Sequence, residues 1–244
     1  MIAYIPTKGR YSTSTYKLFQ EAGIQFLHFI EPSEVDKYNV PNKVDIQNND
    51  QGIAYVRNFM LEYAKQNGHD WIIMCDDDVS DFGYAKNNKC ITHNATIWHE
   101  VKKRAERLPF NIYGLNYRQH AWHEKNEYRI NSSFVEVCVL INVQSIKWKY
   151  RSEYNMKEDR DFILQSIKYG QGCVKFLKLF YNCPGVGSNA GGLNDDYKKK
   201  KDELSAKKMM MEWHPYATIN DKNGRIDVKV DIKALAKYYN KTIK

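Results

Sequence analysis

The feature that most constrains the fold is a run of five apolar residues that ends abruptly in three acidic ones. Residues 71–75 read Trp-Ile-Ile-Met-Cys, and Asp76, Asp77 and Asp78 follow directly. A continuous apolar run of this length predicts a strand that is buried on both faces, as in a parallel sheet. Three carboxylates at the end of such a strand repel one another, so their burial requires a cation or hydrogen bonds to compensate.

Alternating strand and helix patterns surround this run. Short apolar runs predict further strands at residues 2–5, 24–31, 111–117, 133–141 and 173–180. Apolar residues at helical spacing predict helices at residues 13–22, 53–67, 96–108, 159–169 and 195–213. Repeated βα units imply an α/β fold with a mostly parallel, Rossmann-like sheet flanked by helices. Ligands of such sheets bind at the carboxyl ends of the strands.

Composition narrows the possible partners. The formal net charge is +8 and the isoelectric point about 9.0, which favours a polyanion such as nucleic acid. The longest apolar runs are strand-sized, and residues 1–6 lack the pattern of a secretory signal. Five cysteines without a Cys-x-x-Cys pair make a zinc knuckle or a disulfide framework unlikely. We therefore expect a soluble cytoplasmic protein without a membrane partner.

The three aspartates are the strongest candidate for a chemical site. A hard divalent ion with two diphosphate oxygens would compensate their charge, because Mg²⁺ and Mn²⁺ take oxygen ligands and bridge phosphates. Alternate residues of a strand share a side, so Asp76 and Asp78 can face one ligand while Asp77 points away. The alternative is a solvated acidic turn that caps the next segment.

Two further segments carry groups that suit a nucleotide. Residues 6–10, Pro-Thr-Lys-Gly-Arg, follow the first strand, and Thr7, Lys8 and Arg10 can donate to a diphosphate or a base. Arg57 and Asn58 lie in the first turns of a predicted helix, whose N-terminal amides favour anions. An ordinary basic turn and a solvated helix face remain the alternative interpretations of these two segments.

Together these motifs resemble those of the GT-A glycosyltransferases. The resemblance rests on Ile-Pro-Thr-Lys-Gly-Arg at residues 5–10, Gly-x-x-x-x-Arg-Asn at 52–58, the aspartate triplet with Val79, and Glu-Asp-Arg-Asp-Phe at 158–162. More narrowly, the chain is similar to the TET/JBP-associated glycosyltransferases of bacteriophages, which are implicated in sugar modification of hydroxymethylated pyrimidines in DNA. The resemblance covers roughly residues 1–195.

The resemblance implies roles for individual residues. It implies a nucleoside diphosphate sugar as donor, with a UDP-sugar expected, and Mn²⁺ or Mg²⁺ as cofactor. Pro6, Thr7, Lys8, Arg10, Arg57, Asn58, Asp76 and Asp77 would bind the donor. Asp78 would ligate the metal, with Asp76 at the ribose or at the water shell of the metal.

Glu158 and Asp159 match the acidic motif in which a carboxylate accepts the proton of the attacking hydroxyl. Such a base would favour inversion. Acids at a helix N-terminus also have a purely electrostatic explanation.

Three other sites are weaker. GT-A enzymes often supply a late histidine to the metal or phosphate, and His214 is the positional candidate, although a histidine between Trp and Pro is as often a packing residue. Trp122 and His120 could stack on an extruded base. Lys199, Lys200 and Lys201 belong to a basic segment that could contact DNA phosphates. The glycine-rich residues 185–192 could close over the donor or form a surface connection.

We therefore expect a single GT-A domain. Its nucleotide-sugar half would span about residues 1–95 and its acceptor half about 96–195, with a Lys-rich extension at 196–244 that packs on this core. The expected acceptor is a 5-hydroxymethylpyrimidine in DNA. The alternatives are a GT-A transferase with a glycan or lipid-linked acceptor, and a non-catalytic DNA-binding module on the same scaffold. The sequence leaves the oligomeric state open.

Overall fold

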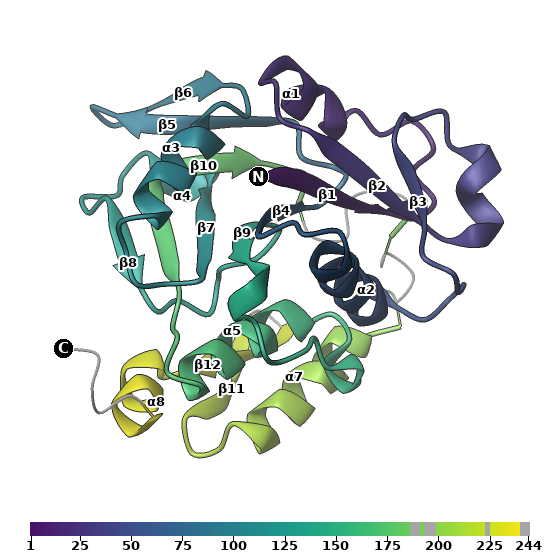
Figure 1. Ribbon diagram of the computed structural model, residues 1–244. Coiled ribbons are helices and arrows are strands. Elements are labelled where there is room, and N and C mark those ends of the chain that lie inside the picture. The colour runs from purple at the N-terminus through teal and green to yellow at the C-terminus, as the bar shows by residue number, and fades with distance from the viewer. Residues whose placement is uncertain (186–190, 193–198, 223–224, 240–244) are drawn as a thin grey trace.

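The first four strands in the sequence are parallel and lie side by side in one sheet (Figure 1). The computed structural model describes residues 1–185, 191–192, 199–222 and 225–239. Strand β1 (Ile2–Thr7) pairs with β2 (Phe26–Ile30) on one side and with β4 (Trp71–Cys75) on the other. Strand β3 (Lys43–Asp45) pairs with the outer side of β2.

Helices connect these strands. Helix α1 (Thr15–Glu21) leads from β1 to β2, and the 3₁₀ helix η1 (Pro32–Lys37) follows β2. Helix α2 (Ile53–Gln66) leads from β3 to β4. These connections are those of βα units, and they bring the carboxyl ends of β1 and β4 to the same edge of the sheet.

The remaining strands extend the same sheet. Within the described residues it has ten strands in the order β3-β2-β1-β4-β9-β7-β10-β5-β6, and β8 also pairs with β10. The added strands are β5 (Asp81–Lys86), β6 (Lys89–His93), β7 (Ile112–Tyr117), β8 (Tyr128–Ile130), β9 (Cys138–Asn142) and β10 (Val174–Asn182). The pairings place only β5, β8 and β9 against the common direction of the other strands. The expected mostly parallel α/β sheet is confirmed.

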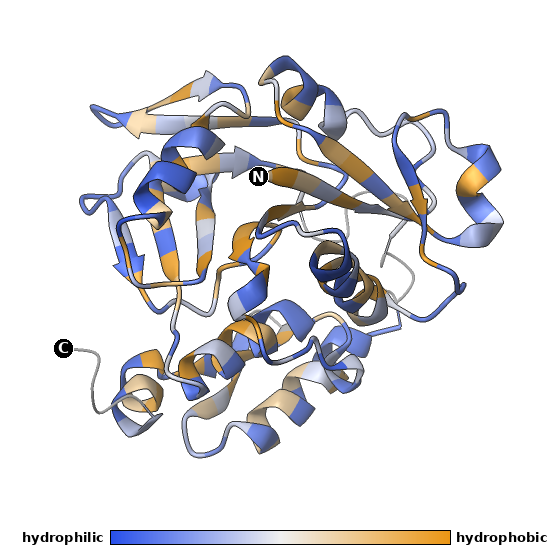
Figure 2. Ribbon diagram, in the orientation of Figure 1, coloured by the Kyte–Doolittle hydropathy of each residue, from blue (hydrophilic) through white to orange (hydrophobic). Residues whose placement is uncertain are grey.

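The central strands are buried on both faces because alternate side chains enter two different cores. Tyr4 and Met74 pack into a core that includes residues of α2 and of α5 (Glu158–Lys168). Ile5 and Ile73 point the other way, into a core shared with α1 and with α3 (Ile97–Ala105). Figure 2 shows the apolar strands in the middle of the molecule. The uninterrupted apolar run of β4 therefore has the cause that the sequence indicated.

Two predicted elements begin five or more residues later than expected. The strand expected at 133–141 begins only at Cys138, because Val137 has a positive φ of 64°, which an extended strand does not contain. The helix expected at 195–213 is α7 (Lys201–Glu212). Residues 195–198 lie outside the described residues, and Lys200 precedes α7 in a left-handed conformation.

The β5–β6 hairpin has no counterpart among the elements expected from the sequence. Its two strands are joined by Asn87 and Asn88, whose φ angles of 51° and 58° are both positive. Two consecutive residues with positive φ are typical of the type I′ turn, whose twist matches that of paired strands. Asparagine tolerates this conformation better than most residues, so the Asn-Asn pair was the available signal.

The last part of the described chain packs against the start of α5. It comprises α7, a hairpin of β11 (Ala217–Lys222) and β12 (Arg225–Val230), and α8 (Ile232–Tyr239). Helix α7 contacts the 3₁₀ helix η3 (Ser152–Tyr154), and α8 contacts α5. The short elements α4 (Arg118–Ala121) and η2 (Val143–Ser145) complete the described fold. No helix among the described residues combines the length and apolar character needed to cross a bilayer.

A buried carboxylate joins α5 to this C-terminal part. Asp161 is fully buried and accepts hydrogen bonds from Arg151, from Gln165 Nε2 at 2.9 Å and from Trp213 Nε1 at 2.9 Å. Arg151 also pairs with Glu212 at the end of α7, at 2.9 Å. The charge of Asp161 is therefore satisfied by groups from both sides of the contact.

We expect Asp161→Ala to lower the free energy of unfolding by about 3 kcal/mol, because it leaves the buried Trp213 N–H without its acceptor and the partly buried Arg151 with Glu212 alone. Urea denaturation at neutral pH measures this loss. Glu100→Ala is the matched control, since it removes the exposed Glu100–Arg104 pair (2.7 Å) and should cost no more than ~0.5 kcal/mol. Equal losses in the two variants would contradict the assignment.

Candidate active site

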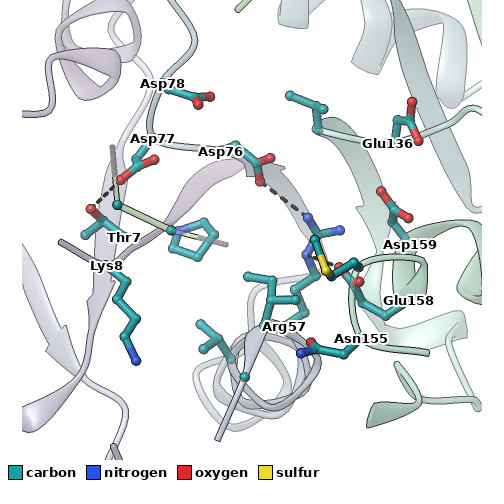
Figure 3. Close-up of a pocket in the computed structure, with 18 of the residues that line it drawn as sticks. Thr7, Lys8, Arg57, Asp76, Asp77, Asp78, Glu136, Asn155, Glu158 and Asp159 are labelled. Carbon is teal, nitrogen blue, oxygen red and sulfur yellow. Dashed lines mark hydrogen bonds and ion pairs between the residues drawn. The ribbon is translucent and has the colours of Figure 1, made fainter. Parts of the chain in front are cut away.

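A cavity of about 660 Å³ opens at the carboxyl ends of β1 and β4. Residues from the end of β1, the start of α2, the turn after β4 and the start of α5 line it (Figure 3). The lining brings together most of the residues singled out in the sequence: Pro6, Thr7, Lys8, Arg10, Arg57, Asp76, Asp77, Asp78, Glu158, Asp159 and Lys201.

The three aspartates have different environments. Asp77 is buried, accepts a hydrogen bond from Thr7 Oγ1 at 2.5 Å and forms an ion pair with Arg10. Asp76 instead faces Arg57, and Asp78 lies 3.3 Å from Arg10 Nη2. Figure 3 shows Asp77 turned back toward Thr7, away from the side on which Asp76 and Asp78 lie. Asp77 therefore ties the end of β4 to the end of β1, and its two neighbours line the cavity.

Arg57 lies at the centre of the acidic side chains. Its Nη2 is 3.4 Å from Asp76 Oδ1, its Nε is 3.6 Å from Glu158 Oε1, and its guanidinium lies 5.6 Å from the ring centre of Tyr150. The side chain enters from α2, whose N-terminus follows Gly52 with a φ of 81°. Gly52 is needed there because an L side chain rarely adopts this backbone conformation.

Burial dominates the electrostatics of the site. Burial, together with the neighbouring carboxylates Asp78 and Asp77, raises the pKa of Asp76 to about 7 despite Arg57. Burial and Asp159 raise the pKa of Glu158 to about 7, again against the attraction of Arg57. Glu158 Oε2 is buried without a hydrogen-bond partner among the described residues. The cavity thus holds more acid than its arginines neutralise.

Glu136 is a site residue that the sequence analysis missed. It lines the cavity near Asp159 (Figure 3), and its Oε2 lies 3.5 Å from Arg160 Nε. Burial, and then the charge of Asp159, raise the pKa of Glu136. A single acid inside the otherwise apolar stretch 134–141 was the available signal, since a charge in a core strand needs an explanation.

The backbone beside these acids is strained. Val137 and Met156 have φ angles of 64° and 77°, and both residues line the cavity. A β-branched residue at positive φ is a genuine outlier, and such residues concentrate at functional sites. The carbonyl of Val137 accepts a hydrogen bond from the backbone N–H of Asp76 at 3.1 Å. The unusual conformation of Val137 therefore helps to fix the turn that carries the aspartates.

The structure places several other expected residues away from the cavity. Asn58 binds the backbone of Tyr150 through both ends of its amide, at 2.8 Å each. His214, Lys199 and Lys200 are exposed and are not part of the lining.

Trp122 and His120 also lie outside the cavity lining. Trp122 lines a second groove of about 630 Å³ beside β5 and α3. Of the glycine-rich segment, residues 186–190 lie outside the described residues, while Gly185, Gly191 and Gly192 line the acidic cavity.

The donor set of the cavity fits a hard divalent cation. Asp76 and Asp78 supply carboxylate oxygens on one side of the turn. In the described part of the chain, no three His, Cys, Asp or Glu side chains lie close enough together to hold a metal by themselves. Asp76 and Asp78 could therefore hold Mg²⁺ or Mn²⁺ only together with other ligands, since Mg²⁺ is usually held by one or two carboxylates with substrate phosphates and water.

Comparison with known proteins identifies one family. A sequence profile described as TET-Associated Glycosyltransferase matches residues 1–188. No curated protein matches the chain. Among solved structures the chain is similar to A197 from STIV, with 11% identity, a TM-score of 0.47, and coverage of 74% of this chain and 83% of that chain. It is also similar to CMP:2-keto-3-deoxy-manno-octonic acid synthetase complexed with CTP, with 10% identity, a TM-score of 0.45, and coverage of 85% and 98%.

The raised pKa of Glu158 predicts a pH-dependent stability. The folded protein retains a proton on Glu158 up to about pH 7, whereas an unfolded glutamate loses it near ~4.3. Its contribution to stability is therefore complete below about pH 4 and is lost as the pH rises through about 7. Glu158→Gln should show a shallower decline in urea midpoint between pH 5 and pH 8 than the unmodified protein, while the exposed Glu153→Gln should not differ from it. An unchanged slope in Glu158→Gln would contradict this assignment.

Proposed function

The chain belongs to the TET-associated glycosyltransferase family, and we propose that it transfers a sugar from a nucleoside diphosphate sugar to the hydroxyl of a 5-hydroxymethylpyrimidine in DNA. The observation that carries the proposal is the coincidence of family and geometry. The profile match spans the acidic motifs at 76–78 and 158–159, and the fold brings both motifs to one cavity. A UDP-sugar is the donor that we propose.

The donor would lie against the ends of β1 and β4. Thr7 and Arg10 already hold Asp77, so Arg10 is positioned at the edge of the aspartate turn, where a diphosphate would lie. Lys8 projects into the same cavity and is paired with Glu31 at 2.8 Å and with Asp50 at 2.6 Å. A bound diphosphate would compete with these two acids for the ammonium group of Lys8.

Asp78 and Asp76 would hold a divalent cation. When bound, such a cation stabilises negative charge on the departing diphosphate. The residues of the chain then have two remaining tasks, which are to neutralise the excess acid and to orient the acceptor hydroxyl. Arg57 serves the first task because it lies between Asp76 and Glu158.

Asp159 would act as the general base. It takes the proton of the acceptor hydroxyl while that oxygen forms a bond to the anomeric carbon of the sugar. The bond from the anomeric carbon to the diphosphate breaks, and its electron pair leaves with the nucleotide. A base on the acceptor side favours this direct displacement with inversion. Asp159 lines the cavity at the first turn of α5, and a carboxylate positioned at the acceptor hydroxyl can serve as general base.

The net charge supports a nucleic-acid acceptor. A formal charge of +8 attracts a polyanion at long range. Lys201 lines the cavity, and the exposed Lys199 and Lys200 precede it. These lysines would contact phosphates beside the acceptor nucleotide, so that they would contribute affinity without sequence preference.

Transfer to DNA can be measured directly. We expect that the protein, incubated with mixed UDP-sugars, Mn²⁺ and DNA containing 5-hydroxymethylcytosine or 5-hydroxymethyluracil, increases the mass of one modified nucleoside by a single sugar. EDTA and Asp78→Ala should each abolish this product, because both remove the proposed cation site. Mass spectrometry of the digested nucleosides gives the result, with unmodified DNA as the control. Transfer to a glycan or lipid-linked acceptor without transfer to DNA would contradict the proposed acceptor, and full activity in EDTA would contradict the metal.

The base is tested by one substitution. Asp159→Asn should reduce the rate of transfer by roughly 10²-fold or more while donor affinity changes only a few-fold, because the amide keeps the shape but accepts no proton. Single-turnover kinetics and donor titration separate the two quantities. Glu153→Gln, an exposed acid in η3, serves as control and should retain the rate. An unaltered rate in Asp159→Asn would move the role to another acid of the cavity.

A further inference from the structure

An exposed aromatic ring contacts Arg160, one of the residues that line the cavity. Phe134 is 46% exposed, and the guanidinium of Arg160 lies 4.5 Å from its ring centre. Arg160 directly follows Asp159 and lines the cavity. Phe134 therefore adjoins the acidic motif through one intervening side chain, and it lies outside the residues to which either the sequence motifs or the family match gave a role.

We propose that Phe134, backed by Arg160, is the platform on which the planar base of the acceptor nucleotide stacks. This inference rests on the proposed DNA acceptor and specifies where the base lies. Arg160 occupies one face of the ring, and the exposure of Phe134 leaves ring surface for a second planar group. Stacking on an aromatic side chain is a usual way to hold an unpaired base, because every base has a π face.

The platform is held rigidly from behind. Arg160 Nη1 lies 2.9 Å from Asp227 Oδ1 of β12, and its Nε lies 3.5 Å from Glu136 Oε2. These contacts fix the guanidinium plane against the ring. A fixed partner lowers the entropy that stacking would otherwise cost.

The exposure of Phe134 does not result from a loose segment. Its neighbours Ser133 and Val135 are both buried. A Cβ added to Gly114 of β7 would lie 2.7 Å from Val135 Cγ1, so Val135 fills the space that the glycine leaves. The chain is thus anchored on both sides of a large apolar residue that faces solvent. A single exposed apolar residue is ordinary on a protein surface; its position beside the acidic cavity and its cationic partner give this one a specific use.

The location is consistent with the chemistry of the acceptor. A 5-hydroxymethyl group lies in the plane of its base, at the edge of the ring. A base stacked on Phe134 would lie beside Arg160, so that this edge, and with it the hydroxyl, can point toward the cavity that Arg160 and Asp159 line. Trp122, which is similarly exposed, lines the separate groove beside β5 and α3. Phe134 is not part of the cavity lining itself, but it contacts Arg160, which is.

Steady-state kinetics of matched aromatic variants test the platform. The probes are a duplex oligonucleotide with one 5-hydroxymethylcytosine and the UDP-sugar that the unmodified protein transfers fastest. Phe134→Leu should raise the KM for the oligonucleotide about 10-fold or more, since stacking on an aromatic ring contributes strongly to the binding of a base. The KM for the donor, the slow hydrolysis of the donor by water and the melting temperature should stay within about 2-fold or a few degrees of the unmodified protein. Phe134→Tyr should retain the affinity, and Trp122→Leu is the control for loss of an exposed aromatic ring elsewhere.

The outcomes are distinct. An oligonucleotide KM that rises in Phe134→Leu and is restored in Phe134→Tyr supports the platform. An unchanged KM in Phe134→Leu, or a rise only in Trp122→Leu, overturns it while the transfer to DNA by the unmodified protein still stands. If the unmodified protein hydrolyses the donor but transfers sugar to no DNA, the proposed function itself fails, and the platform for a base fails with it.

Discussion

A single buried guanidinium holds the two acidic motifs of this protein together. Asp76 at the end of β4 and Glu158 at the start of α5 are far apart in the sequence, and Arg57 of α2 lies between them. Placing carboxylates in a protein interior is costly unless a positive group accompanies them. The ring of Tyr150, stacked at 4.0 Å on Phe162 of α5, supports the other side of Arg57. Without this cation the sheet edge and the helix start would repel each other where they need to meet.

The division of tasks among the three aspartates follows from the same constraint. Asp77 takes the alternate direction of the chain, where Thr7 and Arg10 satisfy it inside the protein. It thereby anchors the turn to β1, the first strand of the sheet. That anchor holds the turn from which Asp76 and Asp78 reach the cavity. Three consecutive aspartates therefore hold the turn more rigidly than Asp76 and Asp78 would alone, because the middle residue, Asp77, is fixed to β1.

The sequence predicts those features of this structure that depend on short segments of the chain, and not those that depend on tertiary contacts. The strand of residues 71–75, the βα order of the first half and the meeting of residues 6–10 with the aspartate triplet follow from apolar patterns and from the rule that strand ends meet at one edge. Asn58 illustrates the limit. Its position in the motif suggested a ligand contact, but its amide closes two backbone hydrogen bonds to Tyr150, a residue that only the tertiary fold brings near.

Glu136 illustrates a second limit, which is topological. Strand β9 runs antiparallel to β4, so that Cys138 at the start of β9 pairs with Cys75 at the end of β4. The residues that precede β9 therefore arrive at the edge of the sheet where the parallel strands end. The rule that ligands bind at the carboxyl ends of parallel strands does not predict these residues, because they lie at the amino end of a strand. The reversed strand thus determines which residues form the wall opposite the aspartates.

The C-terminal part of the chain contributes to the same wall, although the family match ends at residue 188. Asp227 of β12 lies 3.1 Å from Lys157 Nζ and 2.9 Å from Arg160 Nη1, the two basic residues on either side of Glu158 and Asp159. Lys157 is buried, so its charge depends on this partner for compensation. Asp227 therefore restrains the basic residues that flank the acidic motif. The start of α5 is held from two directions, by Arg57 of α2 and by Asp227 of the C-terminal hairpin. Residues outside the matched region consequently help to set the geometry of the motif inside it.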